Sequence, residues 1–200
     1  MFNTSFVRPF FSDSLKTISE ARNCIVIAFV LYCGSIFVGW IYADNFSFLE
    51  AQIRQLAAQF VGKDAITFIF MIFLHNLFAT YVAMCFAVLF GVVPAIIAVF
   101  NGLVLGWLFA KSSGMPQVNI SVMIIPHGIF EWPAMLIAWG VGIWRGVGFR
   151  FSDTPGTWRQ RWEKANKLFF TVILPLLLIA AIIEGRYHIW KQVSDLLENF

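Results

Sequence analysis

The segment PHGIFEWPAM, residues 126–135, carries two ionisable side chains within a long apolar run. His127 and Glu131 are four residues apart, so a helix would place them on one face, one turn from each other. Ionisable groups are costly in hydrocarbon and usually face other helices or a water-filled cavity. The pair could therefore hold helices together by hydrogen bonding, handle ions, protons or small solutes, or support metal-based chemistry.

Three further polar residues lie in apolar segments and could join this pair. Asn76 and Asn101 fall near the middle of their segments, and Glu184 falls near the end of the last one. We therefore expect an intramembrane polar cluster, either functional or structural, that consists of His127, Glu131, Asn76, Asn101 and Glu184.

Motifs for enzymatic chemistry are absent from the sequence. The His-x-x-x-Glu spacing differs from the His-Glu-x-x-His pattern of zinc proteases, and no Gly-x-Ser-x-Gly or phosphate-binding loop occurs. Cys24, Cys33 and Cys85 lie in apolar runs without metal-ligand spacing, and such cysteines behave as small hydrophobic residues. We expect a protein that is not an enzyme, with no catalytic residue, no metal site and no cofactor.

The composition is that of a membrane protein. The 200 residues are 60% hydrophobic and only 12% charged, whereas soluble domains carry about 25% charged residues. No Asp, Glu, Lys or Arg occurs between residues 65 and 110, and about 20 apolar residues suffice to cross the bilayer core as a helix. The sequence predicts an all-α, polytopic membrane helical bundle of about five transmembrane helices, with no soluble enzyme domain.

Five spans can be placed, with a short segment at each end of the chain. The predicted spans are 23–42, 64–89, 93–111, 121–144 and 167–183. They divide the chain into a cytoplasmic N-terminal segment (1–22), a membrane domain (23–186) and an extracytoplasmic tail (187–200). Two connecting segments, 46–63 and the region around Trp158 and Trp162, have amphipathic patterns typical of interfacial helices or partner-docking surfaces.

The distribution of basic residues predicts the orientation. The segment 145–167 carries six lysines and arginines, and the N-terminal segment carries Arg8, Lys16 and Arg22. Loops rich in these residues stay in the cytoplasm. An odd number of spans puts both segments there, so we expect a multi-pass cell-membrane protein with a cytoplasmic N-terminus. The basic residues are explained by topology, and we expect no nucleic-acid partner.

Small residues predict where helices pack closely. Small residues that recur every four positions lie on one face of a helix and let a neighbouring helix approach closely. Gly102 and Gly106 form one such series, and Ala134, Ala138 and Gly142 form another. The second series shares a face with His127 and Glu131, so that face should point into the bundle.

Two prolines allow two different conformations of the 121–144 span. Pro133 cannot donate to the carbonyl of Ile129 and should kink the helix. Pro126 suits the first turn of a helix. A new helix could therefore start at Pro126 after a separate short piece, or one helix could run through it.

Three segments together resemble a known family. PHGIFEWPAMLIAWGVGIWRG resembles the signature of the stage II sporulation protein M family of integral membrane proteins. FGVVPAIIAVFNGLVLGWLFA is similar to that family's Gly…Pro…Asn-Gly-x-x-x-Gly segment, and AAIIEG to its closing glutamate-containing helix. The resemblance covers roughly residues 20–190. It implies a scaffold like the namesake, which anchors cell-wall hydrolases in spore formers, although the family also occurs in organisms that make no spores.

Two functions therefore stand as expectations. The first is a membrane scaffold or assembly component, embedded in the lipid bilayer and bound to other membrane or envelope proteins. The alternative is a small transporter or channel that uses the polar cluster and could act as a homo-oligomer.

Overall fold

The chain folds into seven α-helices over the residues that the structure describes. The computed structural model of the protein describes residues 4–60, 63–86, 89–112, 120–151 and 156–187. The helices are α1 (Thr4–Ile41), α2 (Phe48–Phe60), α3 (Ala65–Cys85), α4 (Val92–Ser112), α5 (Ile120–Phe151), α6 (Trp158–Leu168) and α7 (Leu174–Tyr187). Short 3₁₀ turns occur at Ala43–Phe46 and Leu89–Gly91, and a π-turn at Phe169–Ile173 joins α6 to α7. These ranges contain no strand, so the predicted all-α fold is confirmed.

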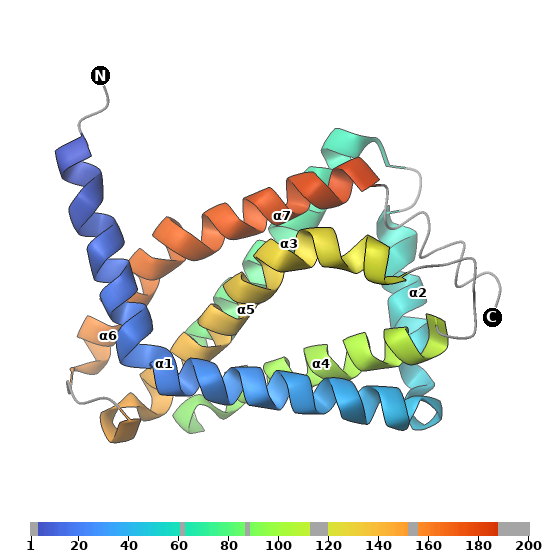
Figure 1. Cartoon of the computed structure of the whole chain (residues 1–200), viewed down its shortest axis with the longest axis horizontal. Helices are drawn as coiled ribbons and strands as arrows, with labels where there is room; N and C mark the ends of the chain where they lie inside the picture. Colours follow the sequence, from blue (N-terminus) through green and yellow to red (C-terminus); the bar gives the residue numbers. More distant parts are fainter. Residues whose placement is uncertain (1–3, 61–62, 87–88, 113–119, 152–155, 188–200) are drawn as a thin grey trace.

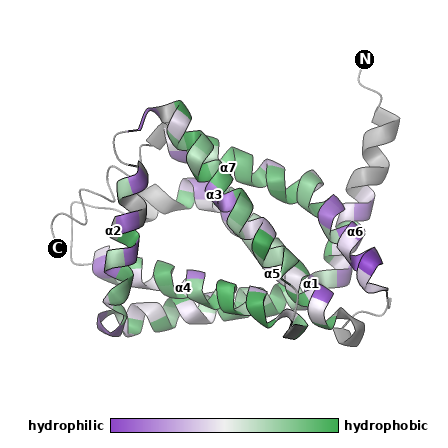
Figure 2. Ribbon diagram, turned by 180° about the vertical axis from the view of Figure 1, so that it is seen from behind, coloured by the Kyte–Doolittle hydropathy of each residue, from purple (hydrophilic) through white to green (hydrophobic). Residues whose placement is uncertain are grey.

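Four of the described helical segments are long and apolar enough to cross a membrane. They are Ser12–Ile41, Ile66–Cys85, Val92–Ser112 and Trp158–Gly185. The remaining predicted span lies in α5, whose 32 residues exceed the roughly 20 needed to cross the bilayer core. Figure 2 shows the long helices as mainly hydrophobic and places hydrophilic residues along α2 and around α6. The predicted count of about five spans therefore agrees with the structure.

Two helices extend further than the sequence patterns indicated. α1 begins at Thr4, so most of the predicted N-terminal segment belongs to the same helix as the first span. The continuous helical segment that contains the last span begins at Trp158, because α6 runs through the π-turn into α7. α6 starts with a capping box: the backbone N–H of Gln160 donates to Thr157 Oγ1 at 3.3 Å, and the backbone N–H of Thr157 donates to Gln160 Oε1 at 3.0 Å.

One helix runs through both prolines of the PHGIFEWPAM segment. α5 includes Pro126 and Pro133 in its interior, so no separate helix starts at Pro126. Figure 1 shows α5 bending between its yellow N-terminal part and its gold remainder. Proline is the usual cause of such a bend, because it removes one backbone donor and crowds the preceding turn.

The helices form a bundle in which α5 is central. α1 packs along α4, α3 packs along α7, and α5 contacts each of these four helices (Figure 1). The core combines fully buried small residues such as Ala28 and Ala138 with the buried indole rings of Trp139 and Trp144. The first part of α1 and α6 lie at one end of the bundle, and α2 lies at the other (Figure 1). Both basic segments of the sequence are thus at the same end.

Small residues allow the close helix contacts. A Cβ atom on Gly102 would lie 1.9 Å from Ser35 Oγ, and one on Gly106 would lie 2.0 Å from the carbonyl oxygen of Ile36. The structure thus places both glycines against the backbone of α1. In α5, Ala134 and Ala138 are fully buried, and a Cβ on Gly142 would lie 2.7 Å from Pro94 Cγ of α4.

Asp64 fixes the start of α3. Its Oδ1 accepts hydrogen bonds from the backbone N–H groups of Ile66 and Thr67, each at 3.1 Å, and its Oδ2 accepts one from the Thr67 hydroxyl at 2.6 Å. These bonds, above all the one from the Thr67 side chain, hold the pKa of Asp64 below its usual range. The cap therefore stays charged into mild acid, which favours the positive end of the helix dipole.

Candidate functional site

The strongest candidate site joins α5 and α7. His127, Glu131 and Glu184 each offer one ligand atom, and these atoms all lie within 4.8 Å of one another. His127 Nε2 is 3.6 Å from Glu131 Oε2, with side-chain exposures of 10% and 14%. Glu184 is 4% exposed. We call these three residues the His–Glu–Glu cluster.

Local packing turns Glu184 into the bundle. The next residue, Gly185, sits so close to α3 that a Cβ atom on it would lie 2.1 Å from Ile69 Cγ1. One turn earlier, Ala181 is buried with Phe68 and Ile72 of α3. These contacts hold α7 against α3, and α7 also packs against α5. The face of α7 that carries Glu184 is therefore buried rather than exposed to lipid.

The structure does not bring the two asparagines into this cluster. Asn101 Nδ2 donates to the carbonyl oxygen of Ile97, one turn earlier in α4, at 2.8 Å. Asn76 is half-buried on α3 and takes part in none of the hydrogen bonds seen among the described residues. Of the five predicted cluster residues, the three that carry ionisable groups are together.

The electrostatics of the His–Glu–Glu cluster limit its chemistry. Two carboxylates within 4.8 Å repel each other when both are ionised. Their burial also removes the water that would otherwise stabilise the charges. Binding of protons or of a cation would relieve this repulsion. An imidazole nitrogen with two carboxylate oxygens is a set of groups that can bind either.

A second group of polar side chains lies toward the opposite end of α5. Arg145 is buried, and its Nη1 donates to the carbonyl oxygens of Met84 at 2.9 Å and Cys85 at 3.3 Å. Its guanidinium carbon lies 4.3 Å from the ring centroid of Trp162 and 4.8 Å from that of Trp158. Arg145 thus caps the last carbonyls of α3 and ties α3, α5 and α6 together.

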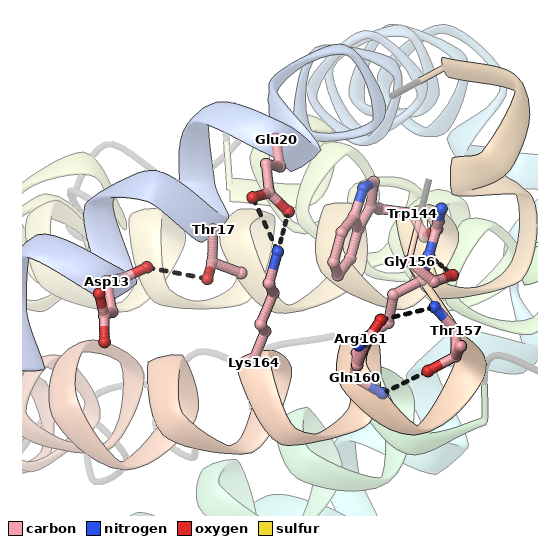
Figure 3. Close-up of polar contacts among 9 residues, drawn as sticks. All are labelled: Asp13, Thr17, Glu20, Trp144, Gly156, Thr157, Gln160, Arg161 and Lys164. Atoms are coloured by element: carbon pink, nitrogen blue, oxygen red, sulfur yellow. Dashed lines mark hydrogen bonds and ion pairs between the residues drawn. The ribbon is translucent and has the colours of Figure 1, made fainter. Parts of the chain in front are cut away.

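Arg161 forms a matching contact from α6. Its Nη1 donates to the carbonyl oxygen of Trp144 at 2.9 Å, and its Nε donates to the carbonyl oxygen of Gly156 at 3.2 Å. The guanidinium also lies over the Trp144 ring, 4.9 Å from its centroid (Figure 3 draws these residues). In the sequence these arginines indicate only topology, because a single sequence does not show which carbonyl oxygens accept their hydrogen bonds.

Two ion pairs join α6 to the first part of α1, and Figure 3 shows the one between Lys164 and Glu20. Lys164 Nζ lies 2.8 and 2.7 Å from the two carboxylate oxygens of Glu20, and Lys167 pairs with Asp13. Beside them is a cavity of about 470 Å³. The residues that line it, here called the α1–α6 surface, are Asp13, Lys16, Thr17, Glu20, Gly156, Gln160, Glu163, Lys164 and Lys167.

Several helices are apolar and long enough to cross a membrane. Polar side chains such as those of His127, Arg145 and Glu184 are buried inside the bundle. These features define a multi-pass α-helical membrane protein. The family model described as Stage II sporulation protein M matches residues 28–187. The chain therefore belongs to the stage II sporulation protein M family, which confirms the resemblance seen in the sequence. Comparisons with curated proteins and with solved structures found no match. The family match includes all three residues of the His–Glu–Glu cluster.

Proposed function

We propose that this protein is a membrane scaffold or assembly component of the cell membrane, with a cytoplasmic N-terminus and a partner protein bound at the α1–α6 surface. The observation that supports this function is the cavity between α1 and α6, which charged residues of both signs line at one end of the bundle. Such a surface offers charge complementarity to a protein partner. The scaffold role implied by the family resemblance is of the same kind.

The ion pairs of the α1–α6 surface favour binding of a partner protein at that surface. The side chains of Lys164 and Glu20 are 40% and 8% exposed, and those of Lys167 and Asp13 are 31% and 58% exposed. The more exposed pair, Lys167 with Asp13, contributes little to stability, but both pairs hold long side chains in one arrangement. A surface ordered in advance loses less conformational entropy when a partner binds.

Photo-crosslinking in cells tests this scaffold function. A photoreactive residue placed at the exposed Gln160 should give a discrete protein adduct. The charge reversal Glu163→Lys in the same chain should weaken that adduct at least threefold, because it alters the surface next to the probe. The matched control is a probe at Phe78, a 72% exposed residue of α3, which should give only lipid adducts. Equal labelling of lipid from both positions, with no protein adduct, would contradict the scaffold function.

A transporter or channel is the second candidate, and the buried His–Glu–Glu cluster favours it. Ionisable groups inside a membrane protein often mark a proton or ion pathway. Under this hypothesis Glu131→Gln, which removes the charge and keeps the shape, should abolish proton or cation flux into liposomes while the protein keeps its thermal stability. If the parent protein passes no ions, the transporter hypothesis is wrong.

A further inference from the structure

We propose that the His–Glu–Glu cluster binds one divalent first-row transition-metal cation, of the zinc, manganese and iron(II) class, between α5 and α7. This inference goes beyond the scaffold function and does not depend on it. It differs from the sequence-based expectation of no metal site. The sequence predicted Glu184 in a polar cluster with His127 and Glu131, and the structure brings one ligand atom from each of these three residues within 4.8 Å of the others.

The geometry is close to that of a bound ion. Zinc bonds to histidine nitrogen and carboxylate oxygen are about 2.0–2.2 Å long, so ligand atoms around one ion are about 3–4 Å apart. The ligand atoms of the cluster lie within 4.8 Å of one another, and His127 Nε2 lies 3.6 Å from Glu131 Oε2. Small side-chain rotations would therefore suffice to bind the ion. Three protein ligands leave a coordination position for water or another ligand.

The charge balance favours a divalent cation. Two carboxylates with a neutral imidazole carry a charge of −2, which one divalent ion cancels without protonating any ligand. Glu184 also lies in the last turn of α7, where the helix dipole disfavours an anion. The buried Arg145 is engaged with α3 carbonyls, and it lies 14 residues from Glu131, about 21 Å along α5.

The ligand types select the class of metal. Magnesium and calcium prefer oxygen ligands alone, whereas imidazole suits zinc, iron, nickel and copper, and carboxylates suit manganese. A site with one nitrogen and two oxygens therefore fits zinc, manganese or iron(II). Zinc should bind more tightly than manganese, following the general order of affinities for divalent ions. A bound ion would clamp the start of α5 to the end of α7.

Metal titration of the purified full-length protein tests the proposal. After removal of metal with a chelator, the detergent-solubilised protein should bind one equivalent of Zn²⁺. At a Zn²⁺ concentration 100 times the Kd, its Tm should rise by about 5–10 °C. Mg²⁺ should have no such effect. Glu184→Gln should weaken Zn²⁺ binding at least tenfold, and the control Asp44→Asn, at a 95% exposed carboxylate outside both proposed sites, should bind as the parent does.

Two results would overturn the metal site. The first is a parent protein that binds no Zn²⁺ and whose Tm responds only to pH, which would mean that protons neutralise the cluster. The second is a Glu184→Gln variant that binds Zn²⁺ as tightly as the parent. If that variant does not fold, His127→Gln replaces it and is judged by the same criterion. Crosslinking at Gln160 tests the α1–α6 surface, which is separate from the His–Glu–Glu cluster. A negative crosslinking result would therefore not change the outcome of the Zn²⁺ titration.

Discussion

Gly106→Ala should destabilise the protein by about 1–3 kcal/mol, the usual range for an overpacked interface. The new methyl group would lie 2.0 Å from the carbonyl oxygen of Ile36 and 2.9 Å from the backbone nitrogen of Trp40. Both atoms belong to the backbone of α1, so neither can rotate away. α1 and α4 would have to separate and lose contacts along their interface. Thermal unfolding in detergent should show a Tm lower by about 2–12 °C.

Gly34→Ala is the matched control on the partner helix α1. A Cβ atom on Gly34 would meet nothing within 4 Å. Alanine is a better helix former than glycine by about 0.5–1 kcal/mol, so this change should raise the Tm slightly. The two identical substitutions should therefore have opposite signs. A Gly106→Ala protein as stable as Gly34→Ala would mean that α1 and α4 do not pack as described.

The sequence was sufficient to predict the fold class and most of the helices. Long uncharged runs, such as residues 65–110, predict membrane helices directly, because the bilayer core admits few other structures. The four-residue spacing of Gly102 and Gly106 likewise marked a packing surface. Pro126 was ambiguous, because proline can begin a helix or lie within one. The contacts of the helix with its neighbours decide whether it begins at the proline or runs through it. A single sequence does not show these contacts.

The candidate site was harder to predict, because it depends on contacts between distant segments. His127 and Glu131 could be paired from helical spacing alone, whereas the position of Glu184 depends on how Gly185 packs against Ile69. Asn101 was expected in the cluster, but its side-chain amide donates a hydrogen bond to the carbonyl oxygen of Ile97 in its own helix. Such local bonding is common for asparagine. Polarity within an apolar run therefore did not establish which residues share a site.

α5 separates two kinds of polar chemistry. Near its start, the His–Glu–Glu cluster gathers acidic groups, and toward its end Arg145 meets carbonyl oxygens and indole rings. A proton or a cation would neutralise the acidic groups, whereas the guanidinium of Arg145 donates to carbonyl oxygens of α3. We therefore expect the start of α5 to respond to bound ligands and its end to serve mainly in holding the bundle together.

Arg145→Met should destabilise the protein by about 2–4 kcal/mol. Methionine retains an apolar stem but leaves the carbonyl oxygens of Met84 and Cys85 without this donor, which costs about 1–3 kcal/mol for a buried acceptor. Loss of the contacts with the half-exposed Trp158 and with Trp162 adds about 1–2 kcal/mol. Relief of the burial of a charge offsets part of this sum. The Tm in detergent should fall by about 5–15 °C.

Arg159→Met makes the same chemical change at an exposed position and isolates the effect of burial. The Arg159 side chain is 87% exposed and pairs with Glu163 one turn later in α6. Exposed pairs of this kind contribute about 0.3–0.5 kcal/mol, so the Tm should change by no more than about 2 °C. Because both variants lose one positive charge, a general electrostatic effect would shift them equally. Equal shifts would show that Arg145 acts through net charge, and a large shift confined to Arg145→Met would show that its carbonyl and indole contacts hold α3, α5 and α6 together.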